Sequence, residues 1–510
     1  MTVARTRSMA LIGITGAVVE IEADVSSGLP AFALVGLPDA ALGEARERVR
    51  SATGNSGLSF PGRKLTINLS PAALPKHGSA FDLAIAVAAL AADGQLPAES
   101  VASVVHLGEL GLDGRLRPVP GILPAVVAAV RSGHRRVMVP EGSADEARLV
   151  PDAEIIPVAS LREAAIWHGA ELEPIEVEPW RVPAPALSEA TEVGDLADIV
   201  GNSEAVEAAE VVAAGGHHLF LLGPPGAGKT MLASRLPGLL PELELDQALE
   251  VASIRSLVGI AVGSDLPRRP PFEAPHHTAS AAALVGGGSG GAIRPGAAVR
   301  ACHGVLMLDE APEFASHALD SLRQPLEAGV VEIARAAATA RFPARFQLVL
   351  AANPCPCGNA GSPDAECTCS PMMQRRYLGR LSGPLLDRID IRLRIPRVSA
   401  AQLRAGVARP TSTADARQRV ARARERTADR LRDTPWRLNA ELPGRWLRSE
   451  GRVGPDAMTP LDRALERGLI TMRGHDRVLR VAWTLADLDG TDRPSRDHIG
   501  RALLLRRGGA

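Results

Sequence analysis

The fold of this chain is decided by one stretch of its sequence, Gly223-Pro224-Pro225-Gly226-Ala227-Gly228-Lys229-Thr230. The stretch fits the P-loop pattern, a glycine-rich loop that ends in Gly-Lys-Thr. An apolar run at 219–222 precedes it and predicts a buried strand, and the residues 231–236 after it predict a helix. Backbone N–H groups of such a loop and the N-terminus of the following helix bind phosphate groups. We therefore predict an ATP site in which Lys229 reaches the β- and γ-phosphates and the Thr230 hydroxyl binds Mg²⁺.

The alternative to a phosphate site is a glycine turn beside a chance lysine. Lysine itself argues against this alternative, because the chain has only three lysines, Lys64, Lys76 and Lys229, among many arginines.

Two further apolar strands are predicted to end in side chains suited to the same chemistry. The run 304–308 is followed by Asp309 and Glu310, and the run 346–352 is followed by Asn353. Ligands of parallel α/β sheets bind at the carboxyl ends of the strands. We expect Asp309 to bind Mg²⁺, Glu310 to activate the attacking water and Asn353 to polarise that water or the γ-phosphate. The alternative for Asp309 and Glu310 is an acidic pair at a helix N-terminus.

Composition and charge describe a globular chain of about three domains. Of its 510 residues, 46% are hydrophobic, 23% are charged and only 3% are aromatic, and the net charge is −1. From Pro396 onward there are 24 Arg, no Lys and 14 acidic residues, so this part is basic and favours a polyanionic partner. The alternative is a set of arginine-rich helices that face solvent. No long uncharged apolar run is present, so we expect a cytoplasmic protein without a membrane partner.

The chain divides by pattern into four parts. Residues 1–170 alternate predicted strands (17–22 and 64–69) with a predicted helix (81–90), residues 171–192 are a proline-rich acidic linker, residues 193–395 carry the P-loop, and residues 396–510 contain predicted helices at 413–432 and 473–488.

The first part resembles the proteolytic domain of Lon proteases. The resemblance lies in Pro75-Lys76-His77-Gly78-Ser79-Ala80 and in Gly108-Glu109-Leu110-Gly111-Leu112-Asp113-Gly114-Arg115. That family uses a Ser–Lys dyad, but its serine position falls on Ala80, or on Ser79 if one residue is missing, and its lysine position falls on Leu123. Without a lysine no base activates a serine. We therefore expect a non-proteolytic Lon-like domain.

An arginine in Leu385-Leu386-Asp387-Arg388-Ile389-Asp390 follows the third predicted strand. An arginine supplied by a neighbouring subunit stabilises charge on the γ-phosphate in the transition state. We predict this role for Arg388, against the alternative of a surface ion pair.

Four further strings complete a resemblance to the AAA+ ATPases, to their magnesium-chelatase-like group and most closely to the ComM/YifB family. The strings are Pro275-His276-His277-Thr278-Ala279-Ser280, Leu284-Val285-Gly286-Gly287-Gly288, Asn353-Pro354-Cys355-Pro356-Cys357-Gly358 and the segment 382–390. The resemblance implies an αβα core with a parallel sheet, a C-terminal helical lid and a homo-oligomeric ring, usually a hexamer. It also implies ATP-driven branch migration of DNA during natural transformation. The sensor-2 arginine of the family falls on Arg473.

A predicted hairpin at 330–338 lies between the second and third strands. In related helicases such a hairpin enters the ring channel, and there Arg335, with Arg341 and Arg345, would contact DNA phosphates. The alternative is a hairpin that only faces solvent.

The cysteines form two Cys-x-Cys pairs, Cys355 with Cys357 and Cys367 with Cys369. Four thiolates can close a tetrahedral Zn²⁺ site, while a reduced thiol cluster and a redox disulfide are the alternatives. Cys302 stands apart and is expected in the core. His276 and His277 are either a metal pair or, more often in such loops, hydrogen-bonding or phosphate-contacting residues.

Together these features predict an α/β ATPase motor that acts on branched or single-stranded DNA. The alternatives are a chelatase-like ATPase that remodels a protein or a metal-insertion complex, and a nucleotide switch without motor activity.

Overall fold

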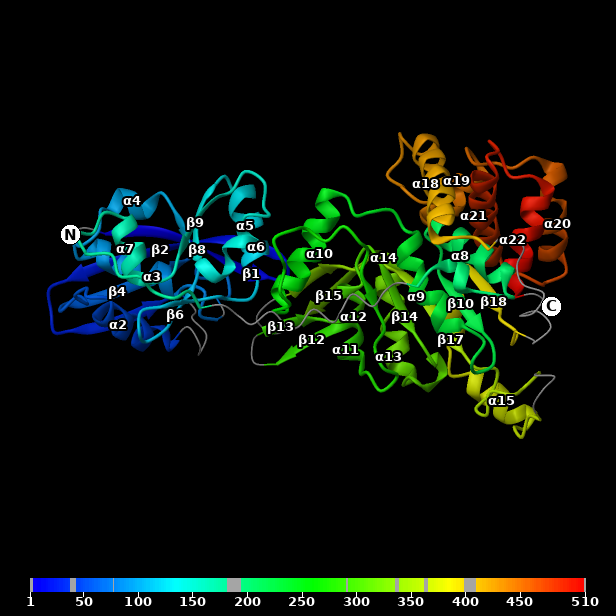
Figure 1. Cartoon of the computed structure of the whole chain (residues 1–510), viewed down its shortest axis with the longest axis horizontal. Coiled ribbons are helices and arrows are strands. Elements are labelled where there is room, and N and C mark those ends of the chain that lie inside the picture. Colours follow the sequence, from blue (N-terminus) through cyan, green and yellow to red (C-terminus); the bar gives the residue numbers. More distant parts are fainter. Residues whose placement is uncertain are drawn as a thin grey trace.

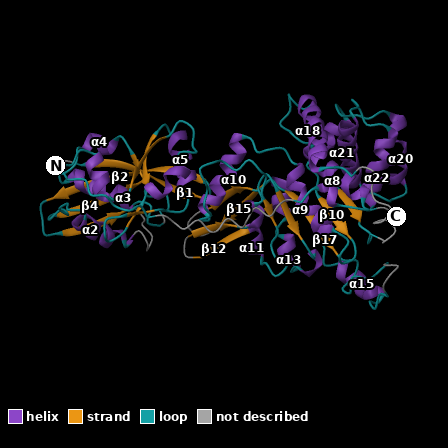
Figure 2. Cartoon of the chain, in the orientation of Figure 1, coloured by secondary structure: helices purple, strands orange, loops and turns teal. Residues whose placement is uncertain are grey.

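The computed structural model describes residues 3–36, 43–76, 78–180, 194–289, 292–334, 339–361, 366–398 and 410–508. The molecule is elongated, with the N-terminal elements at one end, the P-loop region in the middle and the C-terminal helices at the other end (Figure 1). Strands lie in the first two of these regions, and the third is built from helices (Figure 2).

A seven-stranded mixed sheet forms the N-terminal region, in the order β3-β4-β2-β1-β5-β8-β9. Its strands are β1 (Ala4–Ile12), β2 (Thr15–Ser26), β3 (Ala31–Val35), β4 (Lys64–Ser70), β5 (Val105–His106), β8 (Arg136–Pro140) and β9 (Glu154–Val158). The helices packed around it are α2 (Ala45–Asn55), α3 (Asp82–Ala92), α4 (Ala98–Ala102), α5 (Ile122–Arg131), α6 (Ala144–Ala147) and α7 (Leu161–Trp167). All eleven residues of α3 are buried, as its apolar sequence requires.

The P-loop region is built on a five-stranded sheet in the order β11-β14-β17-β10-β18, with every strand pair parallel. Its strands are β10 (Leu219–Leu222), β11 (Phe272–Glu273), β14 (Val305–Leu308), β17 (Gln347–Ala352) and β18 (Ile391–Arg394). The larger helices of this region are α8 (Ser203–Gly215), α9 (Lys229–Leu239), α10 (Leu245–Leu257), α14 (Arg323–Ala328) and α15 (Pro371–Leu378). The predicted strands at 219–222, 304–308 and 346–352 are thus confirmed to within one residue.

Two antiparallel hairpins extend from this region. One is β12 (Gly286–Ser289) with β13 (Ala292–Pro295), and the other is β15 (Val330–Ala334) with β16 (Thr339–Pro343). The hairpins touch, because a Cβ on Gly286 would lie 2.6 Å from Cδ1 of Ile333.

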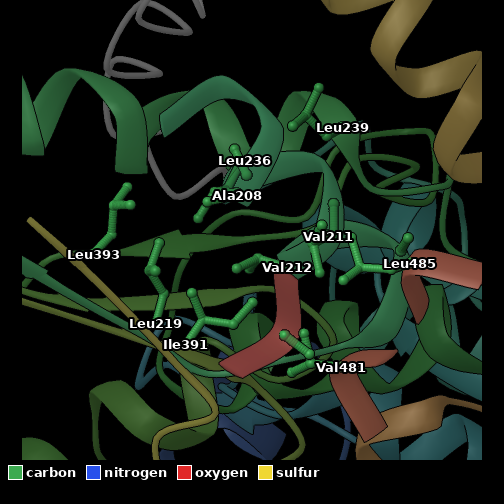
Figure 3. Close-up of a cluster of buried hydrophobic side chains, with 14 of the residues drawn as sticks. Ala208, Val211, Val212, Leu219, Leu236, Leu239, Ile391, Leu393, Val481 and Leu485 are labelled. Carbon is green, nitrogen blue, oxygen red and sulfur yellow. The ribbon is translucent and has the colours of Figure 1, made fainter. Parts of the chain in front are cut away.

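The C-terminal region consists of α18 (Thr413–Arg430), α19 (Gly444–Arg448), α20 (Pro455–Glu466), α21 (Met472–Asp489) and α22 (Arg496–Arg507). One hydrophobic core joins α18, α21 and α22 to α8, α9, β10 and β18. Figure 3 shows Val481 and Leu485 of α21 beside Val211 and Val212 of α8. The helical region is therefore fixed directly to the layer that carries the P-loop.

The N-terminal region packs on the P-loop region through α5 and α10. The Gly121 backbone N–H donates to the carbonyl oxygen of Ser256 (3.0 Å), and that of Leu123 donates to the Ser256 hydroxyl (3.3 Å). The proline-rich segment that follows residue 170 contacts the N-terminal region through Trp180. The guanidinium carbon of Arg117 lies 4.8 Å from the Trp180 ring centroid. Within the described residues, no helix is both long and apolar enough to cross a membrane.

Candidate functional site

The P-loop connects β10 to α9, as its sequence predicts. Gly228 adopts a left-handed conformation (φ 88°) directly before the helix, which a residue with a side chain would adopt only under strain. Lys229 is 8% exposed. Its Nζ donates to the carbonyl oxygens of Gly223 (2.7 Å) and Pro224 (3.0 Å) and to Oδ1 of Asn353 (3.0 Å). Burial lowers the pKa of Lys229, while the charges of Asp309 and Glu310 oppose this shift.

The end of β14 lies beside the start of α9. The Thr230 hydroxyl donates to Oδ2 of Asp309 over 2.6 Å, and the other oxygen, Oδ1, accepts from the Glu310 backbone N–H (2.8 Å). A hydroxyl and a carboxylate in contact are hard oxygen ligands of the kind that Mg²⁺ prefers, so these two side chains fit the predicted metal site. Glu310 has a left-handed backbone (φ 50°), and half of its side chain is exposed.

Asn353 reaches the same place from β17. This strand pairs with β10 on one side and with β14 on the other, so the three strand ends are neighbours at one edge of the sheet. The contact of the Asn353 side chain with Lys229 completes a group of four side chains, which are those of Lys229, Thr230, Asp309 and Asn353.

His277 is a member of the site whose contact the sequence does not reveal. Its Nδ1 lies 3.1 Å from Oε2 of Glu310. The contact arises because His277 follows β11, which pairs with β14 through Phe272 opposite Val305 and Glu273 opposite Leu306. His276 hydrogen-bonds to the Thr278 hydroxyl (2.9 Å), a loop hydrogen bond of the kind expected here, whereas His277 contacts Glu310 instead. Only the pairing of β11 with β14 could have indicated the contact with Glu310.

The two predicted arginines lie outside this group. Arg388 forms an ion pair with Glu327 of α14 and donates to the carbonyl oxygen of Pro384 (2.6 Å), and only 11% of its side chain is exposed. Arg473 is exposed in the first turn of α21, and no hydrogen bond or ion pair of its side chain occurs within the described parts of the chain. Arg335 lies outside the described residues.

The four paired cysteines come together in the loop between β17 and α15. Their sulfur atoms all lie within 4.8 Å of one another, with distances of 3.3 Å from Cys355 to Cys357 and 3.7 Å from Cys367 to each of those two. Two N–H groups point at the sulfurs, the Ala360 backbone N–H at Cys355 (3.3 Å) and the Gln374 amide at Cys367 (3.6 Å). Hydrogen bonding from the Asn359 backbone lowers the pKa of the Cys357 thiol to about 6. The separate Cys302 is fully buried in the core, as expected.

The positions of a Lon-type dyad are used differently. Ser79 donates a hydrogen bond to Glu109, and buried Lys76 donates to the carbonyl oxygens of Gly36 (3.1 Å) and Pro71. Leu123 is fully buried in the first turn of α5. The lysine position of the resemblance thus lies at the contact with α10.

Three family models match the chain in succession. The model described as "Subunit ChlI of Mg-chelatase" matches residues 21–143, "Magnesium chelatase, subunit ChlI" matches residues 195–403, and "Magnesium chelatase, subunit ChlI C-terminal" matches residues 410–506.

Individual relatives give the same result over the whole length. An uncharacterised protein of Mycobacterium tuberculosis is 52% identical over 511 residues, with both chains covered completely. The "Competence protein ComM" of Haemophilus influenzae is 41% identical over 505 residues, which cover 99% of this chain and 97% of that protein. A Lon protease of Rhizobium meliloti is 31% identical over 157 residues, 29% of this chain and 19% of the protease. The chain therefore belongs to the ComM/YifB family of magnesium-chelatase-like AAA+ proteins, and part of it is similar to Lon proteases.

Proposed function

We propose that this protein is an ATP-hydrolysing motor that acts on DNA, with branch migration or helicase activity in recombination during natural transformation. The observation that carries the ATPase part is the meeting of Lys229, Thr230, Asp309 and Asn353 at three adjacent strand ends. This edge is where parallel sheets bind their ligands.

The site residues predicted from the sequence each have a role in the proposed reaction. The P-loop, residues 223–230, binds the phosphates of ATP through the backbone N–H groups of its non-proline residues and through the Lys229 ammonium. Thr230 and Asp309 would bind the Mg²⁺ that neutralises phosphate charge. Glu310 accepts the proton of the attacking water, and Asn353 orients that water or the γ-phosphate. Arg388 of a neighbouring subunit and Arg473 stabilise the charge of the transition state.

The DNA part of the proposal rests on the relative named as a competence protein and on basic side chains of the two hairpins. Arg294 of β13 is exposed and lines a cavity of about 640 Å³. Arg341 of β16 is 69% exposed beside Glu332. In the sequence Arg335 directly follows the last residue of β15, and we assign it a phosphate contact in the channel of a hexameric ring.

The experiment that tests the proposal is the ATP hydrolysis rate of the full chain with and without a four-way DNA junction. We expect the junction to stimulate hydrolysis, and we expect the protein to separate the junction into its component duplexes by branch migration in the presence of ATP. Hydrolysis that no DNA structure changes would reject the DNA part. The family description then favours the second candidate, a chelatase-like ATPase that remodels a protein or a metal-insertion complex.

The thiol cluster supports a structural Zn²⁺ ion as a further cofactor. Tetrahedral Zn²⁺ with Zn–S distances of about 2.3 Å places its sulfurs about 3.8 Å apart, close to the 3.7 Å separations of Cys367 from Cys355 and Cys357. We expect about one zinc per chain in protein purified without chelator, measured by elemental analysis. A metal-free preparation that is folded and active would reject this cofactor.

A further inference from the structure

The cysteine loop, described at residues 354–361 and 366–369, is tied to the ATP site at its first residue. It begins directly after Asn353, whose side chain accepts a hydrogen bond from Lys229 (3.0 Å). Its described residues contain no helix or strand until α15 begins at Pro371. In Figure 1, α15 follows this loop at the periphery of the P-loop region. A displacement of the first turn of this loop would move Asn353.

A second contact joins the loop to the P-loop itself. Gly358 lies against Pro225, because a Cβ added to Gly358 would be only 2.5 Å from Cδ and 2.7 Å from Cγ of that proline ring. Gly358 also has a left-handed conformation (φ 81°). It comes directly after Cys357, so one thiol is adjacent in sequence to the residue that touches the P-loop.

We propose that a soft divalent cation, zinc, held by Cys355, Cys357, Cys367 and Cys369 fixes the cysteine loop against Pro225 and thereby sets the affinity of the P-loop for ATP. Thiolate sulfur selects zinc over the hard cations of the phosphate site. The two N–H groups that point at Cys355 and Cys367 are the outer partners that orient such ligands. Cross-linking both halves of the loop through one ion removes conformations in which Gly358 leaves Pro225. The inference rests on the proposed ATP site.

The chain offers a matched pair of glycines for the test. Gly361 has nearly the same left-handed conformation (φ 74°), but a Cβ added there meets no atom of the described residues within 4 Å. Both Gly358→Ala and Gly361→Ala strain the backbone, and only Gly358→Ala also pushes on the P-loop. Forcing an atom into an occupied contact displaces one of the partners.

The measurement is the dissociation constant of a fluorescent ATP analogue for the full-length variants, with zinc content determined on the same samples. We expect both variants to retain zinc, Gly358→Ala to bind the analogue at least about tenfold more weakly, and Gly361→Ala to remain within about threefold of the natural chain. Equal affinities of the two variants, with zinc retained, would overturn the proposal.

A second arm removes the ion from the natural chain with a thiol reagent and a chelator and then restores it with Zn²⁺. We expect the affinity for the analogue to fall and to recover with the metal, while circular dichroism shows that the chain stays folded. A folded, metal-free chain with unchanged affinity contradicts the inference. Failure of the natural, zinc-loaded chain to bind the analogue at all, like Lys229→Ala, would instead contradict the proposed ATP site.

Discussion

The two sheets of this molecule belong to the same α/β class, but the reactive side chains near them are arranged differently. In the five-stranded sheet, Lys229, Asp309 and Asn353 come from three adjacent strand ends and meet. In the seven-stranded sheet region, the Ser79 hydroxyl donates a hydrogen bond to Glu109, and the Lys76 ammonium donates to two backbone carbonyl oxygens. A fold needs only its apolar core, so one sheet can retain the architecture of an enzyme without retaining a reactive group.

The contact between the two regions explains part of this difference. The helix α5 carries Leu123 at the position where the resemblance places the lysine of Lon proteases, and the Leu123 backbone N–H donates to the Ser256 hydroxyl of α10. A lysine there would have to remove its ammonium group from water, which is costly without a partner. The position that would supply a base is occupied by an apolar contact between regions.

The largest effect that the comparison predicts belongs to the five-stranded sheet. Glu310→Gln keeps the shape of the side chain but cannot accept a proton. General-base catalysis contributes roughly 10²–10⁴-fold, so we expect ATP turnover to fall toward the upper end of that range while ATP remains bound. Single-turnover hydrolysis and filter binding measure the two steps. Normal turnover by Glu310→Gln would remove the proposed role and most of the contrast between the sheets.

Arg388 sharpens the comparison next, because its proposed action needs a second subunit. Arg388→Ala should bind ATP normally and hydrolyse it about 10³-fold more slowly, as for arginine fingers in other P-loop enzymes. If Arg388 served only the ion pair with Glu327, its loss would lower stability and leave the hydrolysis rate of the folded protein unchanged. Steady-state hydrolysis separates these two expectations.

A mixing experiment distinguishes action in trans from action within one chain. Mixed rings of Arg388→Ala and Lys229→Ala subunits should recover some hydrolysis, because one subunit supplies the phosphate site and the other supplies the arginine. The ion pair between Arg388 and Glu327 must open for this, so Glu327→Gln should not reduce hydrolysis. Mixed rings without activity would contradict the assignment.

A third, smaller effect concerns how the helical region is fastened to the five-stranded sheet. Asp390 is 1% exposed, forms an ion pair with Arg477 of α21 and accepts from the His218 backbone N–H (3.1 Å). Removal of one partner from a buried pair costs about 3–5 kcal/mol. We therefore expect Asp390→Asn to lower the unfolding midpoint strongly. Asp429→Asn, in the exposed pair with Arg432, is the control and should change stability by less than about 1 kcal/mol. Similar midpoints would show that the Asp390 pair does not fasten the helices.

The features that could be predicted from the sequence are those that depend on residues close to one another in the chain. Short apolar runs followed by Lys229, Asp309 and Asn353 define the strands and the edge where they end. The two Cys-x-Cys pairs likewise indicate a thiol cluster from the sequence alone. Contacts between distant segments are a different matter, because no local pattern encodes them. The ion pair between Arg388 and Glu327 joins residues that are 61 positions apart in the chain. His277 comes close to Glu310 only because β11 pairs with β14.

The smallest effect tests the other half of the comparison. Ser79→Ala removes a hydrogen bond to Glu109, which is worth about 1 kcal/mol of stability, and touches no part of the ATP site. We expect ATP turnover to stay unchanged and no cleavage of unfolded protein by either the natural chain or Ser79→Ala, because no lysine stands at position 123 to activate a serine. Incubation of both with unfolded protein and ATP, followed by gel electrophoresis, is the measurement. Cleavage by the natural chain that disappears in Ser79→Ala would mean that the N-terminal region has kept a reactive serine with a different base. The two sheets would then differ in the identity of their chemistry rather than in its presence.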